Sequence, residues 1–178
     1  MAFHLARLHV LHYRSHAEAE LRLCPEVNCI TGPNGAGKTN LLDAIHYLSL
    51  AKGYLEPTDQ LSIRHGEELF VIQGTFSGAE GDDAVLISVR RGQRKALSRN
   101  RKEYDRLADH VGRYPVVMIT PYDGQLILDG SEARRRFLDG LIAQFDKAFL
   151  DTLIRYNRAL AQRNALLKQA AMAPVASS

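Results

Sequence analysis

The sequence predicts an α/β fold in which a glycine-rich loop precedes a helix, an antiparallel β meander follows, and the chain ends in helices. Three observations predict it. A cluster of glycine and proline at 32–35 follows a short apolar run and precedes a helical pattern. Strand-like alternation interrupted by glycines fills the next segment. In the last third of the chain, apolar residues recur at helical spacing instead.

Strands are expected in the first two thirds of the chain. Apolar residues near period two predict strands at 5–11 and 19–23, and an apolar run at 27–31 predicts a short buried strand that enters the loop. Glycines at 78, 81 and 92 separate three further segments, which suggests a meander over 69–76, 84–91 and 94–99. Another buried-type strand is predicted at 116–119.

Helices are predicted from about Lys38 to a stop near Gly53, and through most of the chain after 120. Thr120-Pro121-Tyr122-Asp123 combines a capping hydroxyl, proline at the first helical position and a carboxylate at the third. Residues 132–145 and 146–169 follow as helices. In the second of these, leucines at 3–4 spacing fit an arm packed against another helix or a helix docked on the domain's own core.

Composition places the chain among ordinary globular proteins. Its 178 residues fit one domain, or one and a short extension, and 46% apolar residues exclude disorder of the whole. No apolar run approaches the roughly 18 residues of a membrane span, and the N-terminus lacks a secretory pattern. Cys24 and Cys29 give neither zinc spacing nor a disulfide framework, so a reducing, cytoplasmic setting is expected.

Positive charge is concentrated in one segment. The net charge is only +3, yet residues 90–106 hold eight basic residues against Glu103 and Asp105. A basic cluster on a slightly acidic remainder suggests an anionic partner, with nucleic acid first. The alternative is a solvated hairpin face, and Tyr104 as the only aromatic residue of the segment gives little support to stacking on single strands.

The loop itself fits the pattern G-x-x-x-x-G-K-[ST] without a mismatch. Its glycines allow backbone angles that turn N–H groups toward phosphate oxygens, and the following helix adds its positive end. Lys38 would reach the β- and γ-phosphates, and the Thr39 hydroxyl would ligate Mg²⁺. The matched residues are Gly32, Pro33, Asn34, Gly35, Ala36, Gly37, Lys38 and Thr39.

Motifs that are missing from the sequence help to predict which nucleotide binds and whether it is hydrolysed. No Asn-Lys-x-Asp stretch for guanine is present, and Asp109-His-Val-Gly112 follows polar residues rather than an apolar strand, so ATP is favoured by elimination. Hydrolysis needs an acidic residue at the end of an apolar strand. No run of four apolar residues is followed directly by Asp or Glu, so half of the catalytic apparatus is missing.

Longer motifs resemble a known family. The loop with its continuation to Ile45, and Tyr13-Arg14-Ser15-His16 about twenty residues upstream, resemble ABC-type ATPase heads of the RecF, structural-maintenance-of-chromosomes (SMC) and Rad50 group. Residues 119–139 and 154–168 look specifically like the RecF family. The resemblance covers the chain to about Lys168, whereas members of the family are about twice as long.

This resemblance implies an ABC-head-like mixed sheet with an antiparallel meander, followed by the start of an α-helical lever domain. We expect an ATP-binding domain at 1–121, the lever start at 122–170 and a tail at 171–178. Arg14 and Asn40 would join the ATP site. The implied function is recombinational DNA repair and replication, in which ATP and Mg²⁺ bind, DNA gaps or junctions are recognised, and recombinase loading proceeds with RecR and, indirectly, RecO. Weak hydrolysis and ATP-dependent dimerisation belong to the full-length protein.

The basic segment supplies the candidate DNA-binding residues, because phosphate contacts need exposed cations. They are Arg90, Arg91, Arg94, Lys95, Arg99, Arg101 and Lys102. Two alternatives stay open for the whole chain. One is a small P-loop phosphotransferase, which would need an acceptor site and the strand-end acid. The other is a non-catalytic DNA- or RecR-binding module.

Overall fold

The computed structural model describes residues 3–56, 58–124 and 130–172. The chain divides into two compact units, Met1–Asp123 and Gly124–Ser178, and each is described by itself. The domain bounds expected from the sequence remain a prediction. Residues 125–129 of the RecF-like motif and 173–178 of the expected tail lie outside the described residues.

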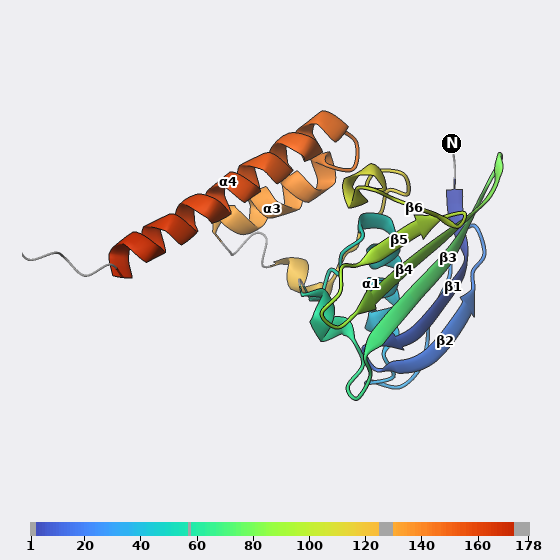
Figure 1. Cartoon of the computed structure of the whole chain (residues 1–178). Coiled ribbons are helices and arrows are strands. Elements are labelled where there is room, and N and C mark those ends of the chain that lie inside the picture. The colour runs from blue at the N-terminus through green and yellow to red at the C-terminus, as the bar shows by residue number, and fades with distance from the viewer. Residues whose placement is uncertain (1–2, 57, 125–129, 173–178) are drawn as a thin grey trace, which may run out of the picture. The chain divides into compact units, whose positions relative to one another are not determined.

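The first unit is built on a six-stranded sheet of order β2-β1-β3-β4-β5-β6 (Figure 1). All five neighbouring pairs are antiparallel. The longest strands lie at the centre, and the chain passes from β3 to β4 through a tight turn that pairs Gly78 with Gly81. The predicted meander is therefore confirmed. The strands are β1 (Phe3–Tyr13), β2 (His16–Arg22), β3 (Leu69–Gly78), β4 (Gly81–Arg90), β5 (Ala96–Arg99) and β6 (Lys102–Glu103).

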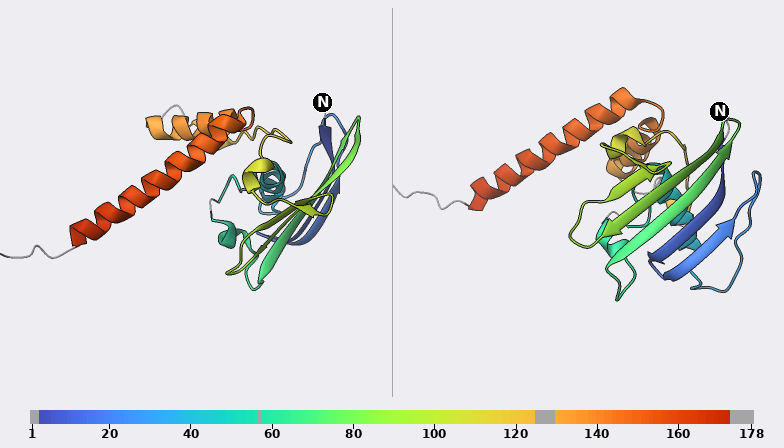
Figure 2. Two further views of the ribbon diagram at one scale, coloured as in Figure 1. Left: turned by 45° about the horizontal axis from the view of Figure 1, so that its top comes forward. Right: turned by 45° about the vertical axis from the view of Figure 1, so that its right-hand side comes forward.

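One face of this sheet is buried under helix α1 (Lys38–Leu50), as the alternation of side chains requires (Figure 2). Along β4 every second residue from Asp83 to Val89 is buried. The helix lies so close to β3 that a Cβ on Gly74 would come within 2.5 Å of the Leu48 side chain. The core lies between sheet and helix and includes Leu8, Val10, Tyr13, Ala44, Tyr47, Leu48, Phe70, Ile72, Val85, Ile87 and Leu97.

Helix α1 confirms the helix predicted after the glycine-rich loop. Gly37 precedes it with a left-handed φ of 86°, and Ala51 ends it with a left-handed φ of 54° and an N–H bonded to the Tyr47 carbonyl. The chain then forms short 3-10 turns, η1 (Asp59–Ser62) and η2 (Leu107–Asp109). A third, η3 (Pro121–Gly124), stands where a helix start was predicted.

Two predicted strands are wrong. Residues 27–31 and 116–119 have no strand pairing, and some of their apolar side chains meet solvent: Val27 is 86% exposed and Ile119 82%. A strand exists only where a neighbour completes its hydrogen-bond ladder, and no described strand lies beside either segment. Strand β5 also begins at Ala96 rather than 94, because residues 91–95 form the turn that precedes it.

The second unit is a pair of helices, α3 (Ser131–Ile142) and α4 (Lys147–Met172). Both were predicted from their spacing, with ends within a few residues. Asp146 caps α4 by accepting a hydrogen bond of 2.9 Å from the Phe149 N–H. Much of their apolar surface, including Leu138 and Leu166, is exposed. Within the described residues, no helix is both long and apolar enough to span a bilayer.

Candidate phosphate-binding site

The glycine-rich loop is an exposed turn whose backbone only glycine adopts easily. Gly32, Gly35 and Gly37 have φ angles of 146°, 83° and 86°. Such angles turn successive N–H groups to one side, and α1 begins directly at Lys38, so the positive end of the helix dipole lies at the loop. The loop and the start of the helix therefore offer backbone N–H donors of the kind that bind a phosphate group.

Lys38 folds back across this loop. Its Nζ donates hydrogen bonds of 2.8 Å to the Gly32 carbonyl and 2.7 Å to the Pro33 carbonyl. The ammonium thus lies against the backbone of the first two residues of the motif. Thr39 follows on the first exposed turn of α1, where its hydroxyl can serve a cation bound beside the phosphates.

The turn between β1 and β2 forms one wall of this loop. His16 Nε2 donates to the Gly37 carbonyl at 3.1 Å, and Asn40 Nδ2 donates to Ser15 Oγ at 2.8 Å. A Cβ on Gly37 would lie only 2.5 Å from both His16 and Ser15. Gly37 is therefore required twice, for its left-handed backbone and for the close approach of this turn.

Arg14 and Asp43 join the same turn to α1. Arg14 Nε donates to Asp43 Oδ2 at 2.8 Å, and the Tyr13 hydroxyl donates to the same oxygen at 2.6 Å. The other oxygen, Oδ1, accepts the backbone N–H groups of Tyr54 and Leu55 at 2.6 Å and 3.1 Å. Asp43 is fully buried. Burial and the carboxylate together raise the pKa of Tyr13, so its hydroxyl stays protonated and remains a donor.

Sequence reasoning placed Arg14 at the site but missed Asp43. An aspartate five residues into an amphipathic helix resembles a residue of the solvent face. The only available signal was a carboxylate within an otherwise apolar and aromatic helix face. Its partners come from turns at 13–14 and 54–55, which no local pattern connects.

The candidate DNA-binding residues divide into two groups. Lys95 and Arg99 point to internal carboxylates: Lys95 Nζ lies 2.7 Å from Asp59 Oδ2, and Arg99 Nη2 lies 2.8 Å from Asp83 Oδ1. The remaining five are exposed, either at the β4–β5 turn or at the β5–β6 hairpin, whose Asn100 and Arg101 both have left-handed backbones. The exposed group is Arg90, Arg91, Arg94, Arg101 and Lys102.

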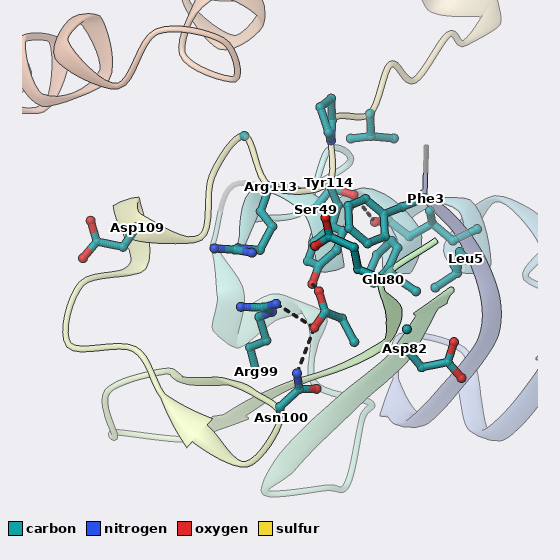
Figure 3. A pocket seen from close by; sticks show the side chains of 17 residues that line it. Phe3, Leu5, Ser49, Glu80, Asp82, Arg99, Asn100, Asp109, Arg113 and Tyr114 are labelled. Atoms are coloured by element: carbon teal, nitrogen blue, oxygen red, sulfur yellow. Dashed lines mark hydrogen bonds and ion pairs between the residues drawn. The ribbon is translucent and has the colours of Figure 1, made fainter. Parts of the chain in front are cut away.

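A cavity of about 1080 Å³ is lined by the C-terminal half of α1 and the start of β1 (Figure 3). Asp83 is one of its lining residues and accepts hydrogen bonds from Arg99, Asn100 and the Tyr114 hydroxyl. Burial alone would raise the pKa of Asp83, but these donors outweigh burial and hold the pKa below its ordinary value. Because its lining holds more carboxylates than cations, this cavity does not suit a phosphate group.

The loop and the helix that follows it match the P-loop pattern of nucleotide-binding domains, although residues 27–31 before the loop form no strand. The chain belongs to the AAA domain family, whose model matches residues 7–167. It is similar to the DNA replication and repair protein RecF of Porphyromonas gingivalis, at 49% identity over 166 residues, which is 93% of this chain and 46% of that protein. The chain thus spans about half the length of the curated relatives it matches.

Solved structures agree with this result. The structure of the recombination mediator protein RecF-ATP in the RecFOR pathway has a TM-score of 0.88 and 27% identity, covering 99% of this chain and 48% of that one. An SMC ATPase at 16% identity, with a TM-score of 0.60 over 80% of this chain, shares the fold alone. The predicted resemblance and the ABC-ATPase-head fold class are confirmed, and the two alternative functions are not favoured.

Proposed function

We propose that this chain is the ATP-binding part of a RecF-like protein of DNA replication and recombinational repair. The observation that carries the proposal is the arrangement of Lys38 over a loop with three left-handed glycines at the start of α1. Arg14 and Asn40 belong to the same site through the β1–β2 turn. The similarity to a structure of RecF with ATP supports a nucleoside triphosphate as the ligand.

Mg²⁺ would be held by Thr39 in this site, where it would neutralise charge shared by the β- and γ-phosphates. A second ligand, an acidic residue at the end of an apolar strand, has no counterpart in this sequence. The chain therefore binds ATP without efficient hydrolysis, and turnover belongs to a longer protein that dimerises around the nucleotide. Purified chain is expected to release no phosphate above background.

DNA binding is proposed for the five exposed cations at the β4–β5 and β5–β6 turns. Phosphate contacts of this kind are independent of sequence and sensitive to salt. Lys95 and Arg99 are left out because their charges are paired inside the unit. We further propose that the longer protein acts in the cytoplasm at gapped or junction DNA together with RecR and, indirectly, RecO.

A thermal-shift experiment tests the nucleotide proposal. ATP with Mg²⁺ should raise the melting temperature of the wild-type chain, because a ligand that binds only the folded state stabilises it. Lys38→Ala should abolish the shift. Lys52→Ala, at an exposed lysine just beyond α1, is the matched control and should retain it. Equal shifts for Lys38→Ala and wild type would refute the assignment of this loop.

A further inference from the structure

The carboxylate of Asp43 accepts four hydrogen bonds, which come from two separate segments of the chain. An ionised carboxylate offers about four acceptor positions, and here each oxygen accepts two hydrogen bonds. Tyr13 and Arg14 come from the end of β1, and two backbone N–H groups come from the segment after α1. A group fixed by four bonds in a fully buried position cannot rotate.

This fixed carboxylate lies near the phosphate-binding loop. Asp43 follows Lys38 by five residues on α1, which is about 7.5 Å along the helix axis. The two residues after Arg14 contact the loop and the first turn of the same helix, through His16 to Gly37 and Ser15 to Asn40. The Arg14 guanidinium is therefore held by Asp43, while the two residues that follow Arg14 in the chain contact the loop and the start of α1.

We propose that Asp43 is a positioning residue, whose carboxylate holds the Arg14 guanidinium in place beside the loop and thereby sets the affinity of the site for a nucleoside triphosphate. The inference rests on the proposed nucleotide binding and adds to it a residue outside the glycine-lysine motif. Asp43 need not touch the nucleotide, because it acts through Arg14.

Two features of Arg14 support a role beyond stability. Its backbone is left-handed, with a φ of 52°, in the two-residue turn closed by the pair Tyr13 and His16, and this conformation is unusual for a residue with a side chain. Its Nη2 atom is buried and makes no hydrogen bond among the described residues. A buried ion pair that leaves a donor unsatisfied is a poor way to stabilise a fold, which points to a role of Arg14 besides stability.

A double-mutant cycle separates positioning from mere stability. ATP–Mg²⁺ affinity is measured by calorimetry for wild type, Arg14→Ala, Asp43→Asn and the double variant. If Asp43 acts through Arg14, each single change weakens binding by about tenfold, and the double variant is no weaker than either, since contacting residues are non-additive. If instead the two losses of ATP affinity multiply, so that the double variant binds about a hundredfold more weakly than wild type, the proposal is overturned.

The matched control is another buried aspartate bound by an arginine in the same unit, Asp83 with Arg99. Asp83→Asn should lower the melting temperature but leave ATP affinity unchanged. Stronger ATP binding by Asp43→Asn would show that the carboxylate competes for Arg14, which also contradicts the proposal. If Asp43→Asn does not fold, Asp43→Glu takes its place in the cycle. Asp43→Glu should weaken ATP binding several-fold in a chain that keeps Arg14, and it should have no effect on ATP binding in the Arg14→Ala variant.

Failure of this inference can be distinguished from failure of the proposed function. If wild type binds ATP and Lys38→Ala does not, the nucleotide site stands whatever the cycle gives. An additive cycle then rejects only the role of Asp43. If Lys38→Ala binds as well as wild type, the nucleotide site itself is wrong, and the inference fails with it.

Discussion

The Lys95 ammonium lies 2.7 Å from the Asp59 carboxylate and 3.1 Å from the Tyr47 hydroxyl, and it also donates to the Ala51 carbonyl. Tyr47 in turn donates to Asp59. A lysine from the most basic segment of the sequence thus joins the start of β5 to the end of α1 and to η1. Only 12% of its side chain is exposed.

Lys95→Ala should therefore destabilise the fold rather than weaken DNA binding. Removing one partner of a largely buried pair leaves Asp59 uncompensated, at a cost of about 2–4 kcal/mol. Urea unfolding measures this cost. Arg94→Ala, its exposed neighbour, should change stability by less than about 0.5 kcal/mol. If the Lys95→Ala chain is as stable as wild type but binds DNA more weakly, Lys95 belongs to the DNA-binding surface after all.

The sequence predicted those features of the structure that depend on a pattern within one short segment of the chain. Strand alternation in β3 and β4 and helical spacing in α1 are local, and both predictions are confirmed, whereas the phosphate-binding role of the glycine-lysine motif stays a prediction. The internal roles of Lys95, Arg99 and Asp43 depend on partners 11 or more residues away. For the same reason the apolar pattern at 27–31 predicted a strand, since no sequence window shows whether a neighbouring strand will be present.

The exposed basic turns should govern DNA affinity. Replacing Arg91, Arg94, Arg101 and Lys102 together by alanine should weaken binding and reduce the salt dependence, because each lost phosphate contact lowers the slope of log K against log salt by about 0.9. Fluorescence anisotropy across a salt series gives the slope. A control with equal charge loss on α4 replaces Arg155, Arg158, Arg163 and Lys168, and it should leave the slope unchanged. Identical slopes for the two variants would reject the proposed surface.

Gly37 and Gly35 should respond differently to alanine. Both have left-handed backbones, so each substitution costs about 1 kcal/mol of strain. Only at Gly37 would the added Cβ also meet His16 and Ser15, whereas at Gly35 no atom lies within 4 Å. Gly37→Ala should displace the β1–β2 turn and lower both melting temperature and ATP affinity well beyond Gly35→Ala. Equal effects of the two would show that this turn does not form the wall of the loop.

At pH values below about 6.5, a buried histidine should make the folded chain less stable. His110 is fully buried, its Nε2 donates to the Leu48 carbonyl, and its Nδ1 has no partner among the described residues. Burial lowers the pKa of His110, and of His46, below the ordinary value. Near pH 6.5 these histidines become protonated in the unfolded chain but stay neutral in the folded chain. The free energy of unfolding therefore decreases as the pH falls, by at most about 1.4 kcal/mol per pH unit for each histidine.

Urea unfolding at pH 7.5, 6.5 and 5.5 measures this dependence. His110→Gln should flatten the decline, while His65→Gln, at an exposed histidine, should leave it as in wild type. If stability rises between pH 7.5 and 5.5, or if the His110 variant declines as steeply as wild type, the buried neutral state of His110 is wrong.

The central claim is that Lys38 and the glycine loop bind the phosphates of ATP. Isothermal titration of the purified chain with ATP–Mg²⁺ tests it most directly. We predict one site per wild-type chain, with affinity reduced at least about tenfold in Lys38→Ala, as expected for loss of a charge-assisted phosphate contact, and unchanged in Lys52→Ala. Equal affinities for wild type and Lys38→Ala, or no saturable binding by the folded wild-type chain, would contradict the claim.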